Sequence, residues 1–266
     1  MSGTLYGIGT GPGDPELLTI KALNIIRRTD ILAIPSEDEE RCLAYRTVRK
    51  ILPQTGNKQL LKLPFPMTGD KLDLRNRHRR YADILEEYLD AGSDVAFLTI
   101  GDPSVYSTYG YLHRILLEDG YAAQMVSGIP SFCAAAATLG EILCEGEETL
   151  EIIPAAALPD SLSDTSLTAG GTKIFMKVSS RSADIAAALK KSGRSASMVQ
   201  NCGSREEKIY RDAGNFPDNP GYFTIILSRA NDGSCAARTG RSSSDSRRRG
   251  TPESGQGEQT DDKKGR

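Results

Sequence analysis

The sequence predicts an α/β protein whose first half contains a parallel sheet and whose second half contains a mixed sheet. In the first half, short apolar runs alternate with longer segments of helical periodicity, which is the pattern of a parallel sheet. Three of these apolar runs end in a glycine-containing turn. In the second half, short strands follow one another with fewer helices between them, which is typical of a mixed sheet.

The first half opens with an apolar strand at 5–8, a glycine-rich turn and an apolar-periodic segment that predicts a helix. The run at 95–100 is continuous and rich in β-branched residues, so it predicts a strand buried on both faces. Further strands are expected at 30–35, 60–63 and 122–126, and helices at 41–51, 72–89, 106–118 and 132–139.

The second half is predicted to contain strands at 149–154, 173–178, 195–200, 206–210 and 221–227, a helix at 181–191 and a polar loop with a short helix at 159–172. From Ala230 onward the chain has no Leu, Ile, Val, Phe, Tyr or Met. Such a segment buries too little apolar area to offset its loss of conformational entropy, so 230–266 is predicted to be a disordered tail.

Composition excludes several classes of protein. The 266 residues carry a formal net charge of −2, which gives no general electrostatic attraction to nucleic acid. No apolar run approaches the length of a membrane span and no signal peptide is recognisable, so we expect a cytoplasmic protein. The five cysteines form no C-x-x-C pair and the two histidines have no metal-ligand spacing, so no metal site held by the protein is expected.

The glycine-rich turn at 7–15 either brings the backbone close to a ligand or is only a tight connection between a strand and a helix. The dinucleotide pattern G-x-G-x-x-G fails, because its third glycine position holds Pro12 or Asp14, depending on the starting glycine. The phosphate-binding P-loop pattern also fails, since no glycine here is followed by Lys and then Ser or Thr. Pro12 and Pro15 remove two backbone donors that a phosphate would need, so a phosphate cradle is not predicted.

Two further loops follow predicted strands, at 101–108 and at 127–131. In open α/β sheets, ligands bind beyond the carboxyl ends of the strands. The three loops are therefore expected to meet in one crevice.

The motifs of these loops resemble those of the tetrapyrrole (corrin/porphyrin) methylases, which use S-adenosylmethionine. They are G-x-G-x-G-P-G-D-P-x-L-L-T-x-K-A-L at 7–23, G-D-P at 101–103 and G-I-P-S at 128–131. Within the family, the stretches at 63–67 and 98–109 are most similar to the branch that methylates C20 of precorrin-2 or cobalt-precorrin-2 (cobalt-factor II) in cobalamin biosynthesis. The resemblance, which extends from Leu5 to about Ser228, implies two α/β domains, for which we expect 1–120 and 121–229, with the cofactor between them, and a homodimer.

The resemblance also implies the residues that bind S-adenosylmethionine. They would come from all three loops and from the ends of two strands in the second half: Pro12, Ile100, Gly101, Asp102, Val105, Tyr106, Pro130, Ser131, Met176 and Cys202. Relatives often have other residues at the positions of Lys177 and Cys202, so the resemblance defines the adenine pocket less well than the G-D-P loop. C20 of a reduced tetrapyrrole is already nucleophilic, so positioning supplies most of the expected rate enhancement.

Three assignments have alternatives. Asp102 either orients the cofactor, accepts the C20 proton as a catalytic base, or bonds the backbone of its own turn. Tyr109, like Tyr106, either faces the substrate or packs in the core. The basic segment 71–80, with Arg77 and Arg80, either is a solvated helix face or attracts the carboxylates of a tetrapyrrole; RNA binding lacks the interleaved aromatic residues it would need.

Competing functions are a family member that methylates another ring position or a macromolecule, and a non-catalytic protein that binds the cofactor. The G-D-P motif disfavours the last of these, and the stretch 106–109 favours C20.

Overall fold

The computed structural model describes residues 2–65, 70–160, 162 and 170–230. Its first sheet has five parallel strands in the order β3-β2-β4-β1-β5. The strands are β1 (Thr4–Gly9), β2 (Ile31–Ile34), β3 (Gln59–Lys62), β4 (Val95–Thr99) and β5 (Ala122–Val126).

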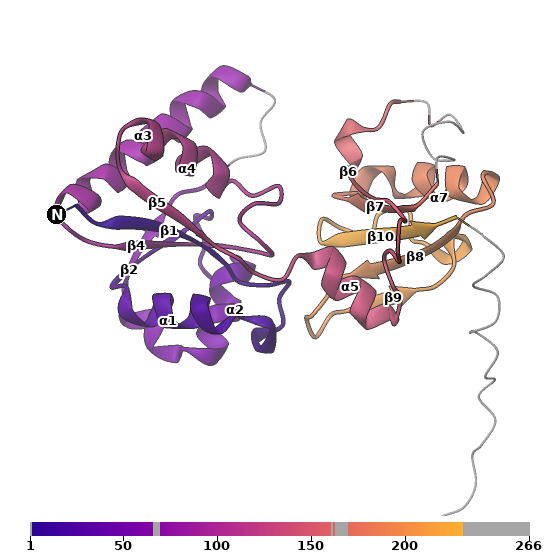
Figure 1. Cartoon of the computed structure of the whole chain (residues 1–266), viewed down its shortest axis with the longest axis horizontal. Coiled ribbons are helices and arrows are strands. Elements are labelled where there is room, and N and C mark those ends of the chain that lie inside the picture. The colour runs from indigo at the N-terminus through magenta and orange to yellow at the C-terminus, as the bar shows by residue number, and fades with distance from the viewer. Residues whose placement is uncertain (1, 66–69, 161, 163–169, 231–266) are drawn as a thin grey trace, which may run out of the picture. The chain divides into compact units, whose positions relative to one another are not determined.

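Helices cover both faces of this sheet (Figure 1). On one face, α1 (Ile20–Arg28) and α2 (Leu43–Ile51) pack on Ile8, Leu32 and Leu98. On the other, α3 (Lys71–Asp90) and α4 (Tyr109–Glu118) pack on alternate residues of the same strands, such as Leu5 and Phe97. Burial on both faces explains why β2 and β4 consist of apolar residues, with Thr99 the one exception.

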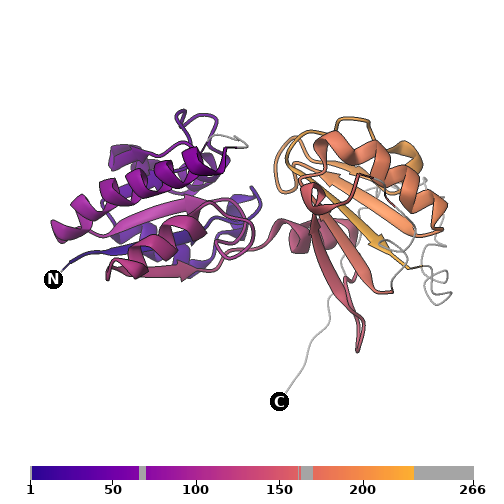
Figure 2. The ribbon, with the colours of Figure 1, turned by 90° about the horizontal axis from the view of Figure 1, so that it is seen from above.

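The second sheet is mixed, in the order β6-β7-β10-β8-β9, with β6 and β7 parallel and the other pairs antiparallel. Its strands are β6 (Leu150–Pro154), β7 (Thr172–Met176), β8 (Ser195–Gln200), β9 (Lys208–Tyr210) and β10 (Thr224–Arg229). Helix α7 (Ser182–Lys191) lies along one face in both views (Figure 1 and Figure 2), and α5 (Ser131–Leu139) packs on the other.

The change from the first sheet to the second comes later than the expected boundary near Gly120. Strand β5 pairs with β1 over five residues, from Thr4↔Ala122 to Ile8↔Val126, and so completes the first sheet. Both sheets belong to one compact unit, Met1–Asn231, so a division into separate domains stays a prediction. The predicted disordered tail lies outside the described residues except for Ala230.

Two element boundaries differ from the prediction in ways that shape the site. Helix α4 begins at Tyr109 rather than at residue 106, which leaves 100–108 as a longer loop. Strand β10 begins at Thr224, because Gly221 has a positive φ of 84° and the Thr224 hydroxyl donates to the carbonyl oxygens of Pro220 and Gly221. The first shift lengthens the loop after β4, and the second lengthens the loop before β10.

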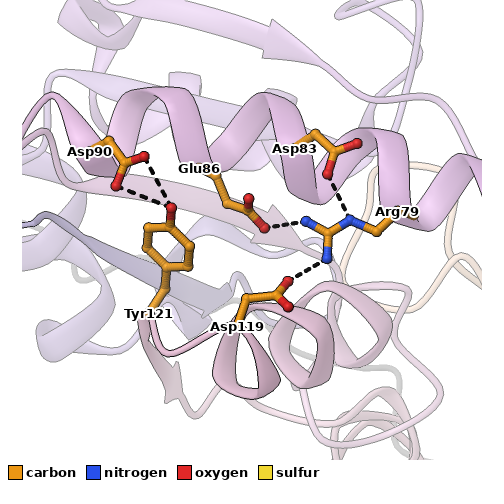
Figure 3. Close-up of polar contacts among 6 residues, drawn as sticks. All are labelled: Arg79, Asp83, Glu86, Asp90, Asp119 and Tyr121. Carbon is orange, nitrogen blue, oxygen red and sulfur yellow. Dashed lines mark hydrogen bonds and ion pairs between the residues drawn. The ribbon is translucent and has the colours of Figure 1, made fainter.

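An ionic cluster ties α3 to the end of α4 (Figure 3). Arg79 of α3 donates to three carboxylates, those of Asp83 (2.6 Å), Glu86 and Asp119. Asp119 is the residue that caps the C-terminus of α4, so the guanidinium joins the two helices. The short 3-10 turns of the chain are η1 (Pro15–Leu17), η2 (Pro53–Asn57), η3 (Ala155–Ala157), η4 (Ser179–Arg181) and η5 (Ala213–Asn215).

Candidate functional site

The first and second glycine loops are joined through their backbones. The Gly101 N–H donates to the Gly11 carbonyl oxygen at 2.7 Å, and the Gly11 N–H donates to the Gly101 carbonyl oxygen at 3.3 Å. Both glycines have a positive φ, 72° for Gly11 and 70° for Gly101, which side chains disfavour. The bridge fixes the two loops side by side beyond the ends of β1 and β4.

The third loop packs against the first two so closely that side chains cannot fit. A Cβ on Gly128 would lie 2.1 Å from the Gly101 carbonyl oxygen, and a Cβ on Gly9 would lie 2.5 Å from the Gly128 nitrogen. The expected convergence of three glycine loops is therefore present, and close contact between backbones is the reason for glycine at both positions.

Asp102 connects these loops with its carboxylate. One oxygen, Oδ1, accepts hydrogen bonds from the N–H (2.8 Å) and hydroxyl (2.5 Å) of Ser104. The other, Oδ2, accepts from the Gly128 N–H at 3.0 Å. The side chain is buried and both oxygens are used, which is the geometry of the turn-bonding alternative and extends it to the third loop.

A cavity of about 360 Å³ lies beside these loops, and its lining includes all ten residues that the resemblance assigned to the cofactor. Pro12 and the loop after β4 form one part of the lining. Pro130 and Ser131 at the start of α5, Met176 at the end of β7 and Cys202 after β8 form the rest. The volume falls within the range of about 300–1,000 Å³ typical of small-molecule sites.

Two residues of the lining and one beside it hold a left-handed backbone without being glycine. These are Tyr106 (φ 48°), Lys177 (φ 58°) and Asn201 (φ 49°), and they are the non-glycine residues of positive φ in the described part of the chain. Tyr106 and Lys177 line the cavity, and Asn201 precedes Cys202, which also lines it. Strained backbone of this kind is concentrated at functional sites, so its position supports the choice of cavity.

Tyr106 reaches from the first half of the chain to the second. Its hydroxyl donates to the Ile152 carbonyl oxygen of β6 at 3.2 Å. The Lys177 ammonium lies 5.7 Å from the centre of its ring, within the distance of a cation–π contact. The side chain is thus held by its hydroxyl on β6 and by the ammonium group of Lys177.

Cys202 is buried, and burial followed by the nearby negative charge of Glu207 raises the pKa of its thiol to about 11. The thiol is therefore neutral at physiological pH and is not a nucleophile there. A neutral, polarisable sulfur suits contact with an uncharged ring system.

Tyr109 does not face the cavity, so its prediction as a substrate-binding residue is wrong. The side chain is fully buried in the core, and its hydroxyl donates to the Gln124 carbonyl oxygen at 2.8 Å. Its ring occupies the space beside Gly7, where a Cβ would lie 2.3 Å from a ring carbon.

Arg77 and Arg80 are exposed on α3 and are absent from the cavity lining. Arg77 pairs with Asp73 of the same helix at 2.9 Å. Within the same basic segment, Arg79 is engaged by its three carboxylates and His78 is buried against Phe65 and Tyr111. A role for Arg77 and Arg80 in attracting substrate stays a prediction.

The cavity lining also contains residues that the sequence did not predict there, among them Arg41, Phe65, Tyr222 and Phe223. The sequence predicts Tyr222 and Phe223 inside the last strand, whereas they precede β10 and are partly exposed. Gly221, directly before them, was the signal for a turn there. Within the ranges that the structure describes, no group of His, Cys, Asp and Glu could hold a metal ion. Every helix in these ranges is too short or too polar to span a membrane.

Comparison with known proteins gives a consistent result. The family model described as Tetrapyrrole (Corrin/Porphyrin) Methylases matches residues 4–214. The Salmonella typhimurium protein named cobalt-precorrin-2 C(20)-methyltransferase is 30% identical over 236 residues, which cover 86% of this chain and 98% of that protein. The Methanocaldococcus jannaschii protein named probable cobalt-precorrin-2 C(20)-methyltransferase is 38% identical over 151 residues, which cover 56% of this chain and 63% of that protein.

Other relatives are matched over part of their length or in fold alone. The matched region is 46% of the Mycobacterium bovis cobalamin biosynthesis protein CobIJ, at 29% identity over 85% of this chain. A structure of the Thermus thermophilus uroporphyrin-III C-methyltransferase complexed with S-adenosylhomocysteine has a TM-score of 0.60 at 19% identity, covering 85% of this chain and 97% of that one. At that identity the likeness concerns the fold.

Proposed function

The chain belongs to the tetrapyrrole (corrin/porphyrin) methylase family, and from that membership we propose that it transfers a methyl group from S-adenosylmethionine to C20 of precorrin-2 or cobalt-precorrin-2 in cobalamin biosynthesis. Two relatives that align with it carry names that state this reaction, one of them along nearly its whole length. The observation that carries the proposal is the cavity lining, which gathers all ten residues expected at the cofactor from five separate parts of the chain.

The cavity suits S-adenosylmethionine in size and chemistry. Carbonyl and N–H groups of the glycine loops offer partners for the amino-acid end, while Met176, Cys202 and Ile225 offer apolar contacts for the adenine. The Thermus thermophilus relative, whose structure holds S-adenosylhomocysteine, has the same fold. When bound, S-adenosylmethionine would supply an electrophilic methyl group for transfer to C20.

The residues of the chain then act mainly by positioning. The bridged glycine loops hold one wall of the cavity at fixed distance, and the apolar side chains exclude water that would compete for the methyl group. Asp102 belongs to this framework, because both carboxylate oxygens accept hydrogen bonds from the loops. We propose it as a positioning residue rather than the base that takes the C20 proton.

One assay tests the proposal. The purified protein is incubated with S-adenosylmethionine carrying a ¹³C-methyl group and with precorrin-2, with and without cobalt, and the product is examined by NMR. A labelled methyl on C20 is the expected result. A labelled methyl group at another ring position, or absence of transfer to precorrin-2 both with and without cobalt, would contradict the proposal.

Methylation of another ring position is the second candidate, because a Bacillus subtilis uroporphyrinogen-III C-methyltransferase is 36% identical over 138 residues. We further propose that the protein is a cytoplasmic homodimer, on the basis of the family resemblance. Light scattering during gel filtration measures the molar mass and hence the oligomeric state. A monomer at micromolar concentration would contradict the proposed homodimer.

A further inference from the structure

The cavity has three charged residues in its lining, Arg41, Asp102 and Lys177, and they differ in their partners. The Asp102 carboxylate accepts three hydrogen bonds from the loops. Arg41 is largely exposed and pairs with Asp38 at 3.3 Å. Lys177 is half-buried, and among the described residues no carboxylate pairs with it.

A second lysine, four residues before Lys177, has a different environment. Lys173 of β7 is almost completely buried, and its ammonium pairs with Glu151 of the neighbouring strand β6. Buried cations are normally paired in this way, because removal from water is costly without a partner. Lys177, four residues later, is positioned at the cavity without such a pair.

The surroundings hold the Lys177 ammonium in place without neutralising it. Its backbone has a positive φ of 58°, directly after the end of β7. The ring face of Tyr106, 5.7 Å from the ammonium, attracts a cation but carries no net charge. Tyr106 is itself fixed through its hydroxyl on Ile152. The cavity therefore has a pre-positioned positive charge for a ligand anion.

We propose that the Lys177 ammonium binds a carboxylate of the ligand in this cavity. The inference rests on the proposed function, which supplies two sources of that group: the acetate and propionate side chains of the tetrapyrrole and the methionine carboxylate of S-adenosylmethionine. The Tyr106 ring orients the lysine, and a charge-assisted hydrogen bond forms when the carboxylate arrives.

The test compares Lys177→Met and Lys177→Arg with the wild-type protein, and uses Lys208→Met, an exposed lysine of β9, as the matched control. Calorimetry measures binding of S-adenosylhomocysteine and of 5′-methylthioadenosine, which lacks the amino-acid end. Kinetics with precorrin-2 give KM and kcat. Circular dichroism and thermal melting establish that each variant is folded.

If the tetrapyrrole supplies the carboxylate, Lys177→Met raises KM about tenfold to a hundredfold and leaves S-adenosylhomocysteine binding unchanged. If the cofactor supplies it, the same variant weakens S-adenosylhomocysteine binding by that factor and leaves 5′-methylthioadenosine unaffected. In both cases Lys177→Arg retains most of the affinity. A folded Lys177→Met protein with wild-type values in all three measurements overturns the inference.

The failure of the inference is distinguishable from failure of the proposed function. If the wild-type protein methylates precorrin-2 and Lys177→Met matches it, the inference alone is wrong. If the wild-type protein transfers no methyl group, the proposed function is wrong, and the two binding measurements still decide whether Lys177 contacts a cofactor carboxylate.

Discussion

At the scale of single residues, the three glycine loops pack closely because glycine has no Cβ atom. Gly128 is the sharpest case, since an added Cβ would lie 2.1 Å from the Gly101 carbonyl oxygen and 2.7 Å from the Gly9 carbonyl carbon. These are backbone atoms, which cannot rotate away as a side chain can. The loops would have to separate, and the cavity wall would move with them.

We therefore expect Gly128→Ala to lower the free energy of unfolding by about 3 kcal/mol and to abolish binding of S-adenosylhomocysteine. Urea denaturation and calorimetry measure the two effects. Gly110→Ala is the control, because a Cβ there meets nothing within 4 Å and the residue lies in helix α4. The control should be neutral or slightly stabilising, and equal behaviour of the two variants would contradict the packing argument.

His78 predicts a dependence of stability on pH. Burial against Phe65 and Tyr111 lowers its pKa in the folded protein from the ordinary value of 6.5. The unfolded chain therefore takes up the proton first as pH falls, so stability is lost below about pH 6.5 and is unaffected above it. His113, whose pKa burial also lowers, contributes in the same direction.

The variant His78→Phe keeps the aromatic stacking and removes the titration. Its free energy of unfolding should fall less than that of the wild type between pH 7 and pH 5, as followed by denaturation at each pH. His113→Phe serves as a comparison with the second histidine, which is only partly buried. Parallel curves for His78→Phe and the wild type would show that His78 does not take part.

The residue types in the sequence predicted the convergence of the loops well, but they predicted the directions of individual side chains poorly. Glycine spacing at 7–13, 101 and 128 predicted the convergence, because parallel strands end at one edge of a sheet. The direction of the Tyr109 side chain was not predictable, because it is set by the space beside Gly7 and by the Gln124 carbonyl oxygen, which come from other parts of the chain. The positive φ of Lys177 could not be predicted from the sequence, because glycine and asparagine commonly adopt that conformation and lysine does not.

At the scale of elements, the contact between α3 and α4 concentrates three carboxylates on one guanidinium. Arg79 joins Asp83 and Glu86 of its own helix to Asp119 at the end of α4 (Figure 3). Hydrogen bonding to Arg79 lowers the pKa of Asp119, whereas burial raises the pKa of Glu86. Without the cation, three negative groups would repel one another across the two helices.

Replacement of Arg79 by methionine should destabilise the protein by about 1–2 kcal/mol, with a smaller loss at high salt because the cluster is partly exposed. Lowering the pH should reduce the deficit, since protonated carboxylates no longer repel. Denaturation at several pH values and salt concentrations measures this. Arg80→Met, an exposed neighbour on the same helix, is the control.

A second substitution checks the cause. Asp119→Asn in the Arg79→Met background removes one of the repelling charges and should restore part of the lost stability. If the double variant is less stable than Arg79→Met alone, the repulsion argument is wrong, and packing of the long arginine stem accounts for the loss instead.

Elements were the most predictable level of this structure. Continuous apolar runs predicted β2 and β4 because both faces of the sheet are covered, and helical periodicity predicted α3 to within one residue at each end. Ends near the cavity were least predictable. Tyr222 and Phe223 have the residue types of a strand interior, yet tertiary contacts place them before β10, at the ligand site.

At the scale of the whole molecule, the cavity is lined by both halves of the chain, so a bound ligand should stabilise both together. We expect S-adenosylhomocysteine at one hundred times its dissociation constant to add about 2.7 kcal/mol, which raises Tm by roughly 5–10 °C in a protein of this size. Differential scanning fluorimetry with increasing ligand measures the shift.

Met176→Glu is the matched variant, since it places a negative charge in the cavity lining at the end of β7. It should retain most of the unliganded stability, because the residue is partly exposed, and lose the ligand-induced shift. A full shift in this variant would mean that the ligand binds elsewhere.

The backbone bridge between Gly11 and Gly101, together with the close approach of Gly9 and Gly128, also determines how the protein can be redesigned. Substitutions at these glycines would separate the loops, so a library directed at them would yield mostly inactive clones. New acceptor molecules are better sought by randomising side chains of the cavity lining, such as Phe65, Tyr222 and Phe223.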